Sequence, residues 1–157
     1  MTGSEKEDEV NMRVKRLGHV VLRVRELERS VRFYGEVLGL REVARYGGRM
    51  VFFSLGENHH DLALQEVGAG APSPHPRSVG LYHVAFKVGD GMEELRAWRD
   101  HLERHGVPIL GASDHRVSQA LYVTDPDGIE IELYVDADPA VWRNDPSAVA
   151  TIEPIDL

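Results

Sequence analysis

A short pattern recurs in the two halves of this chain. LGHVVLRV (17–24) and LYHVAFKV (81–88) share leucine, any residue, His-Val, two residues, a basic residue and valine. After each copy, apolar residues recur at spacings of three and four, which predicts a helix with one buried stripe. We expect Gly39 and Gly106 to cap the ends of these helices. The pattern indicates one supersecondary unit used twice.

Strand-like apolar runs follow each predicted helix. They lie at 50–55 and 60–67 in the first half and at 120–124 and 129–135 in the second. Together with the opening strand of each half, they indicate the order β-α-β-β-β, repeated once. We therefore predict an α+β fold of two βαβββ modules.

The rest of the chain is punctuated by polar or irregular segments. We predict that module one spans 13–67 and module two 80–136, joined by a linker at 68–79 that is rich in Gly, Ala and Pro. The charged leader, 1–12, is predicted to be disordered. The tail, 137–157, contains three prolines and is expected to run irregularly over the surface.

Composition excludes several classes of function. The chain has 157 residues and a net charge of −8, which disfavours nucleic acid or an anionic membrane as a partner. It contains no cysteine, which excludes thiolate chemistry and fits a cytoplasmic protein. No apolar run approaches the length of a membrane span, and the acidic N-terminus does not resemble a signal peptide.

Three polar side chains are expected to share one side of the two sheets. Side chains alternate faces along a strand, so His19 and His83 oppose the apolar residues of the two repeat strands. Glu132 opposes Ile131 and Leu133 in the last strand. Two imidazoles and a carboxylate in one cup suit a divalent metal and leave positions open for substrate and O₂. The alternatives are ordinary strand-edge histidines and, in a shifted register, Glu130 in place of Glu132.

The sequence resembles the vicinal-oxygen-chelate superfamily of glyoxalases, bleomycin-resistance proteins and extradiol dioxygenases, from about Val14 to the end. The second half resembles the extradiol signature. His115-RVSQA-Leu121-Tyr122-VT-Asp125-Pro126-Asp127-Gly128-IEI-Glu132 fits each of its terms from the histidine to the glutamate, and Ser113 departs from it. The segment His60-Asp61-Leu62-Ala63-Leu64 resembles the one that carries the acid–base histidine of these dioxygenases.

The resemblance implies a vicinal-oxygen-chelate fold, in which two modules form a cupped mixed sheet around one metal. The implied metal ligands are His19, His83 and Glu132. The implied metal is Fe(II), with Mn(II) or another divalent ion as alternatives. The implied reaction is extradiol cleavage of a small catechol-type aromatic substrate by O₂. His60, or its neighbour His59, would act as the acid–base residue, and His115 and Tyr122 would hydrogen-bond the substrate oxygens.

Two other functions remain open at this point. A glyoxalase-type isomerase or lyase would use a fourth ligand from the last strand of module one, where Gln65 and Glu66 are the candidates. A bleomycin-resistance-type protein would bind a small molecule without catalysis. The family also implies a homodimer, by analogy rather than from the residues. The sequence does not name the substrate.

Overall fold

The computed structural model describes residues 12–157 and confirms the repeated βαβββ order. The predicted leader, apart from Met12, lies outside the described residues. Module one contains β1 (Val20–Val24), α1 (Leu27–Val31), its π-helical continuation η1 (Arg32–Val37), β2 (Arg41–Tyr46), β3 (Met50–Ser54) and β4 (Leu62–Glu66). Module two contains β5 (His83–Gly89), α2 (Met92–Arg104), β6 (Gly111–Asp114), β7 (Ser118–Thr124) and β8 (Glu130–Asp136).

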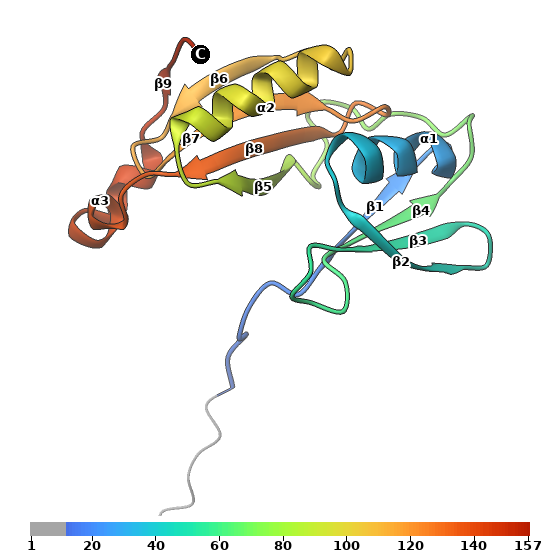
Figure 1. Cartoon of the computed structure of the whole chain (residues 1–157). Coiled ribbons are helices and arrows are strands. Elements are labelled where there is room, and N and C mark those ends of the chain that lie inside the picture. The colour runs from blue at the N-terminus through green and yellow to red at the C-terminus, as the bar shows by residue number, and fades with distance from the viewer. Residues whose placement is uncertain (1–11) are drawn as a thin grey trace, which may run out of the picture.

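The two modules form two separate mixed sheets (Figure 1). The strand orders are β1-β4-β3-β2 and β5-β8-β7-β6-β9. In each sheet the first strand of the module pairs in parallel with its last strand, and the remaining pairs are antiparallel. The strands that open the two modules, β1 and β5, therefore lie at sheet edges. Each of them pairs with a single neighbouring strand, β4 or β8.

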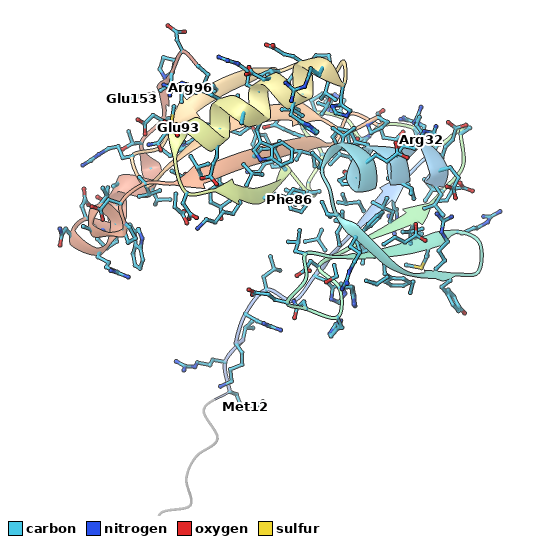
Figure 2. The ribbon with its side chains drawn as sticks, in the orientation of Figure 1. Met12, Arg32, Phe86, Glu93, Arg96 and Glu153 are labelled. Atoms are coloured by element: carbon cyan, nitrogen blue, oxygen red, sulfur yellow. The ribbon has the colours of Figure 1, made fainter. Side chains whose placement is uncertain are left out.

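The helices cover one face of each sheet and leave the other face open. Leu22 and Val24 of β1 are buried, whereas Val21 and Arg23 are exposed, as the alternation predicted. The same alternation holds in β8, where Ile131, Leu133 and Val135 are buried. Figure 2 shows Glu93 and Arg96 on the outer side of α2, while Leu95 and Leu102 are buried against the sheet. None of the described helices combines the length and the apolar character that a membrane crossing requires.

The predicted glycine caps are confirmed. Gly39 and Gly106 have φ of 77° and 67°, in the left-handed region that glycine adopts with little strain. The predicted first helix is less regular than expected. Its second half is π-helical, because the amide of Leu38 donates to the carbonyl of Phe33 rather than to that of Tyr34.

The prediction that the tail runs irregularly is wrong. It forms a short helix, α3 (Pro139–Asn144), a 3-10 turn, η2 (Pro146–Ala150), and a two-residue strand, β9 (Glu153–Pro154), which pairs with β6. Asp138 and Asp145 cap the two helical turns through side-chain acceptors. Two of the three prolines, Pro139 and Pro146, stand at the first helical positions, where a backbone amide would have no hydrogen-bond partner within the helix. The third, Pro154, lies in β9.

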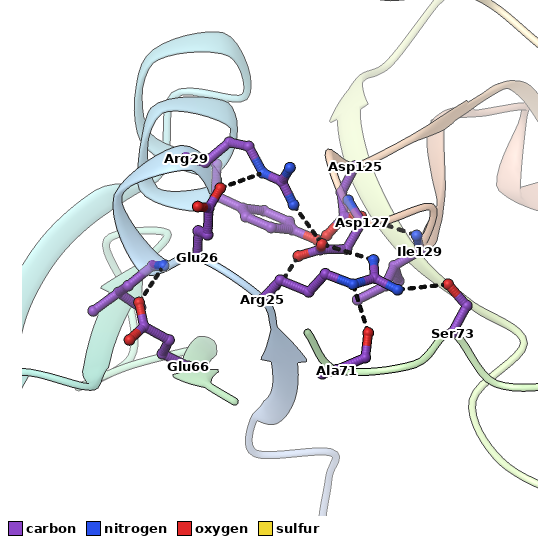
Figure 3. Close-up of polar contacts among 11 residues, drawn as sticks. Arg25, Glu26, Arg29, Glu66, Ala71, Ser73, Asp125, Asp127 and Ile129 are labelled. Atoms are coloured by element: carbon purple, nitrogen blue, oxygen red, sulfur yellow. Dashed lines mark hydrogen bonds and ion pairs between the residues drawn. The ribbon is translucent and has the colours of Figure 1, made fainter. Parts of the chain in front are cut away.

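One carboxylate joins the two modules (Figure 3). Asp127, in the turn before β8, accepts hydrogen bonds from the Arg25 amide at 2.9 Å, the Arg25 guanidinium at 3.1 Å and the Arg29 guanidinium at 2.5 Å. Its side chain is 6% exposed. Arg25 also donates to the carbonyl of Ala71 and to the hydroxyl of Ser73, so it holds the linker as well.

A second buried pair reinforces this contact. The Tyr34 hydroxyl, fully buried in module one, donates to Asp125 at 2.9 Å. The other oxygen of Asp125 accepts the amides of Asp127 and Ile129 and shapes the turn. Burial raises the pKa of Asp125, and burial beside Asp125 raises the pKa of Tyr34. The turn that leads into β8 therefore fixes the position of module one relative to module two.

We predict that Asp127→Ala lowers the free energy of unfolding by about 2 kcal/mol, measured by urea denaturation. The substitution leaves two guanidinium groups without their shared carboxylate, and the partial exposure of both arginines keeps the loss below that of a fully buried pair. The control is Asp156→Ala, which changes the same charge at an exposed tail position and should shift stability by less than about 0.5 kcal/mol. Equal effects of the two substitutions would contradict this role for Asp127.

Candidate active site

His19 and His60 lie together on the open face of module one. His19 directly precedes β1 and is exposed, and its ring centroid lies 4.3 Å from that of His60. The Phe52 ring meets His60 edge-on at 5.4 Å. His60 precedes β4 rather than lying within it, so strand alternation does not turn its side chain into the core with Leu62 and Leu64. We call His19, Phe52 and His60 the first half-site.

The structure distinguishes the two consecutive histidines. The His60 ring is close to those of His19 and Phe52, whereas His59 is exposed and is near His60 alone, with 4.5 Å between the ring centroids. The two Nδ1 atoms are 2.6 Å apart, which leaves Nε2 of His60 as its nitrogen available to a substrate. Loss of hydration, and then the charge of His19, lower the pKa of His60.

His83 lies between two carboxylates on the open face of module two. Its Nε2 is 3.0 Å from Glu132 Oε2, and its Nδ1 is 3.8 Å from Glu130 Oε1. The parallel pairing of β5 with β8 places His83 opposite Glu130 and Ala85 opposite Glu132. Both carboxylates therefore share the face predicted for them, and each meets a different nitrogen of the ring.

A hydrogen-bonded pair lies beside these groups. His115 Nδ1 donates to the carbonyl of Thr151 at 2.8 Å, so in the neutral ring Nε2 accepts the Tyr122 hydroxyl, at 2.7 Å. Tyr122 faces Glu132 across β7 and β8, and its ring centroid lies 6.2 Å from that of His83. We call His83, Glu132, His115 and Tyr122 the second half-site.

The tail contributes to this half-site, which sequence reasoning missed. Thr151 fixes the tautomer of His115 through a backbone carbonyl, and it follows η2 directly. Every residue has a backbone carbonyl, so the residue type at position 151 does not predict this contact. The only signal was the pair of Asp-Pro steps at 138–139 and 145–146, which are good helix starts and argue for an ordered tail.

The structure does not bring the three predicted ligands together within one chain. Among residues 12–157, no group of three or more His, Asp or Glu side chains could hold a metal ion. The single cup around one metal therefore stays a prediction. Within this chain the modules form two sheets, joined by the contacts of Asp127 with Arg29 and of Asp125 with Tyr34. A cavity of about 530 Å³ between the modules is lined by none of the predicted site residues.

Comparison with known families gives the same assignment as the fold. The profile of the Glyoxalase/Bleomycin resistance protein/Dioxygenase superfamily matches residues 16–133. The chain belongs to this superfamily. The match runs from just before His19 to just after Glu132, and so includes every residue of the two half-sites. Thr151, whose carbonyl accepts from His115, lies beyond it.

Several curated relatives of the chain are dioxygenases. Catechol-2,3-dioxygenase of Bacillus subtilis is 36% identical over 129 residues, 82% of this chain and 44% of that protein. Biphenyl-2,3-diol 1,2-dioxygenase 3 of Rhodococcus globerulus is 36% identical over 77% of this chain and 63% of its own length. The chain thus spans about half to two thirds of these relatives. Lactoylglutathione lyase of Escherichia coli O157:H7 is 27% identical, and the match covers 94% of it.

Solved structures support the superfamily fold. A glyoxalase/dioxygenase from Nostoc punctiforme has a TM-score of 0.67 and 23% identity, covering 83% of this chain and all of that one. A glyoxylase/bleomycin resistance protein/dioxygenase domain from Frankia sp. EAN1pec has the same TM-score and 26% identity, covering 80% of this chain and all of that one. The superfamily supports a metal-dependent enzyme and leaves the particular reaction open.

The two candidates for a fourth ligand in this superfamily point to opposite faces. The Glu66 carboxylate accepts the Leu27 amide at 2.8 Å and so belongs to the start of α1. Gln65 pairs with Arg23 in β1 and with Met50 in β3, on the same face as Ala63 and Val21. The open face therefore carries a neutral amide at this position, and the carboxylate is held on the helix side.

We predict that the Tyr122 phenol stays protonated at pH 10, where an ordinary tyrosine is half ionised. Burial and the nearby charge of Glu132 raise its pKa to about 12. The measurement is the chemical shift of the tyrosine Cζ carbon in labelled protein between pH 8 and 11, with the signal assigned from Tyr122→Phe. A midpoint near 10 for that signal would show that the phenol is not shielded in this way.

Proposed function

We propose that this protein is an Fe(II)-dependent extradiol dioxygenase acting on a catechol-type diol, with each active site assembled from two copies of the chain. The observation that carries the proposal is the hydrogen-bonded His115–Tyr122 pair beside the His83–Glu132 pair. The first pair provides polar groups for a bound diol, and the second provides donors for a metal. The 36% identity to two dioxygenases supports the same reaction.

The chemistry of the second half-site fits a divalent cation. Imidazole nitrogen and carboxylate oxygen are ligands of Fe(II), Mn(II) and Zn(II). In the described part of the chain, neither Glu130 nor Glu132 forms an ion pair with a lysine or arginine, so two carboxylates lie beside the His83 ring without a charged side chain to neutralise them. A bound metal would be held by His83, Glu132 and a His19, and would supply Lewis acidity and a site for O₂.

The protein side chains have separate tasks in this reaction. Tyr122 donates its proton to His115, so its oxygen remains to accept a hydrogen bond from a catechol hydroxyl and to orient the ring. His60 stands beside His19 with Nε2 free, where it would take the second hydroxyl proton and later return it. Phe52 provides an apolar surface for the aromatic ring.

A second copy of the chain would complete the site. His19 and His60 lie on one sheet and His83 and Glu132 on the other, and both open faces end at an edge strand, β1 or β5. A two-fold dimer that places module one of each copy against module two of its partner would form two equivalent sites. Exposed apolar side chains on or beside these edges, Val21 at 47% and Tyr82 at 78%, would be covered by this contact.

A glyoxalase-type lyase is the second candidate, because the chain matches nearly the full length of the lactoylglutathione lyases and only part of the dioxygenases. The placement of Glu66 at the start of α1 argues against it, since that carboxylate is already engaged. A non-catalytic drug-binding protein would have no use for His83 and Glu132 as a pair.

We predict equimolar O₂ uptake and a coloured ring-opened product when the anaerobically purified, Fe(II)-loaded protein meets a panel of catechols. His60→Ala should retain iron and lower the rate about 10²- to 10⁴-fold, because it removes the acid–base group. His19→Ala should lose iron. His105→Ala, an exposed histidine on the far end of α2, is the matched control and should keep the full rate.

Each outcome of this assay has a definite meaning. Iron binding without O₂ uptake on any catechol, together with turnover of a hemithioacetal, would replace the dioxygenase by the glyoxalase-type function. A chain that binds neither Fe(II) nor Mn(II) but binds small aromatic molecules would be a binding protein. A full rate in His60→Ala would remove that residue from the chemistry and leave the metal centre intact.

We predict that mixed dimers of two inactive variants regain activity when the defects lie in different half-sites. After subunit exchange, a mixture of His19→Ala and Glu132→Ala should recover about a quarter of the activity, since half of the dimers are mixed and one of their two sites is intact. A mixture of His19→Ala and His60→Ala should stay inactive, because both defects lie in the first half-site. Recovery in neither mixture, with a monomer of 17.6 kDa in solution, would overturn the shared site.

A further inference from the structure

Nδ1 of His83 is buried and has no hydrogen-bond partner. The His83 side chain is 28% exposed, so solvent reaches other atoms of the ring but not this one. An imidazole nitrogen cut off from both water and protein acceptors is costly. The Oε1 atom of Glu130 lies 3.8 Å from this nitrogen.

We propose that Glu130 is a positioning residue, which accepts the Nδ1 proton of His83 and so directs Nε2 toward the metal. The inference rests on the proposed metal site and adds to it a residue outside the ligand set. Register makes the contact specific, because the parallel pairing of β5 with β8 sets Glu130 directly opposite His83. Glu132, two residues further along β8, meets Nε2 instead.

The two carboxylates therefore have different tasks. A ligand imidazole needs the lone pair on one nitrogen and a proton on the other, and an acceptor for that proton fixes both the tautomer and the orientation of the ring. Nε2 lies 3.0 Å from Glu132 Oε2, so these two atoms would both be available to hold a cation. A proton on Nδ1 would face Glu130, with which it could form a charge-assisted hydrogen bond.

The charges around Glu130 agree with this task. Glu130 is 28% exposed, and within the described chain it pairs with no lysine or arginine. The one lysine on the same face of β5, Lys87, is already paired with Asp90 and Asp136. Glu130 is therefore available to His83, and its charge adds to that of Glu132 in attracting a cation.

The test is the affinity for Zn(II), which is diamagnetic and needs no turnover, measured by calorimetric titration of the full chain. We expect Glu130→Ala to weaken binding about 10- to 100-fold and Glu130→Gln to weaken it less, because the amide oxygen still accepts the Nδ1 proton. The control is Asp136→Asn, which removes one negative charge from the same face of β8 and should change the affinity less than about twofold.

A second readout separates positioning from folding. In the Zn(II)-loaded protein, the Nδ1 proton of His83 should give a slowly exchanging NMR signal that is lost in Glu130→Ala and kept in Asp136→Asn. Equal affinities for wild type, Glu130→Ala and Asp136→Asn would overturn the role of Glu130 and leave the proposed metal site standing. An absence of Zn(II) binding in the wild type would overturn the metal site itself, and the positioning role with it.

Discussion

The contact between Asp127 and the two arginines of module one determines how the two modules pack against each other. Three donors from Arg25 and Arg29 meet one buried carboxylate, and Tyr34 adds a second buried contact through Asp125. All of these acceptors belong to the turn that leads into β8, the strand that carries Glu130 and Glu132. The same turn thus joins the two modules and leads into β8, the strand that carries the predicted ligand Glu132.

That arrangement has a consequence for the active site. Within one chain, Asp125 and Asp127 join module two to η1 and α1, and β1 and β5 lie at the edges of separate sheets. A change in how the modules pack would take the shared carboxylate of Asp127 away from the two guanidinium groups, at a cost of about 2 kcal/mol. In the proposed dimer, association with a second copy would complete both sites and leave the contact between Asp127 and the arginines intact. The contact between the modules is therefore compatible with the proposed sharing of sites between two copies.

Sequence periodicity predicted most of the fold, because strand alternation and helical spacing are local properties. The repeat around His19 and His83 located both modules, and the alternation in β1 and β8 assigned buried and open faces correctly. Strands β2 and β6 were implied by the order but not located: every residue of β2 is exposed, and β6 is four residues long, so neither carries an apolar pattern. The ordered tail was missed because two of its three prolines, Pro139 and Pro146, begin helical turns instead of interrupting them.

The site was predictable only in part, for a different physical reason. Strand register identified His83 and Glu132, and the resemblance to the dioxygenase signature identified His115 and Tyr122. The structure brings these four residues together on module two. The distance between this group and His19 depends on contacts between modules, and such contacts are not periodic. Nor does a sequence say which nitrogen of a histidine meets which carboxylate. His83 lies between Glu130 and Glu132 only because the strands β5 and β8 are parallel and in one particular register, and that register gives two identical side chains two different roles.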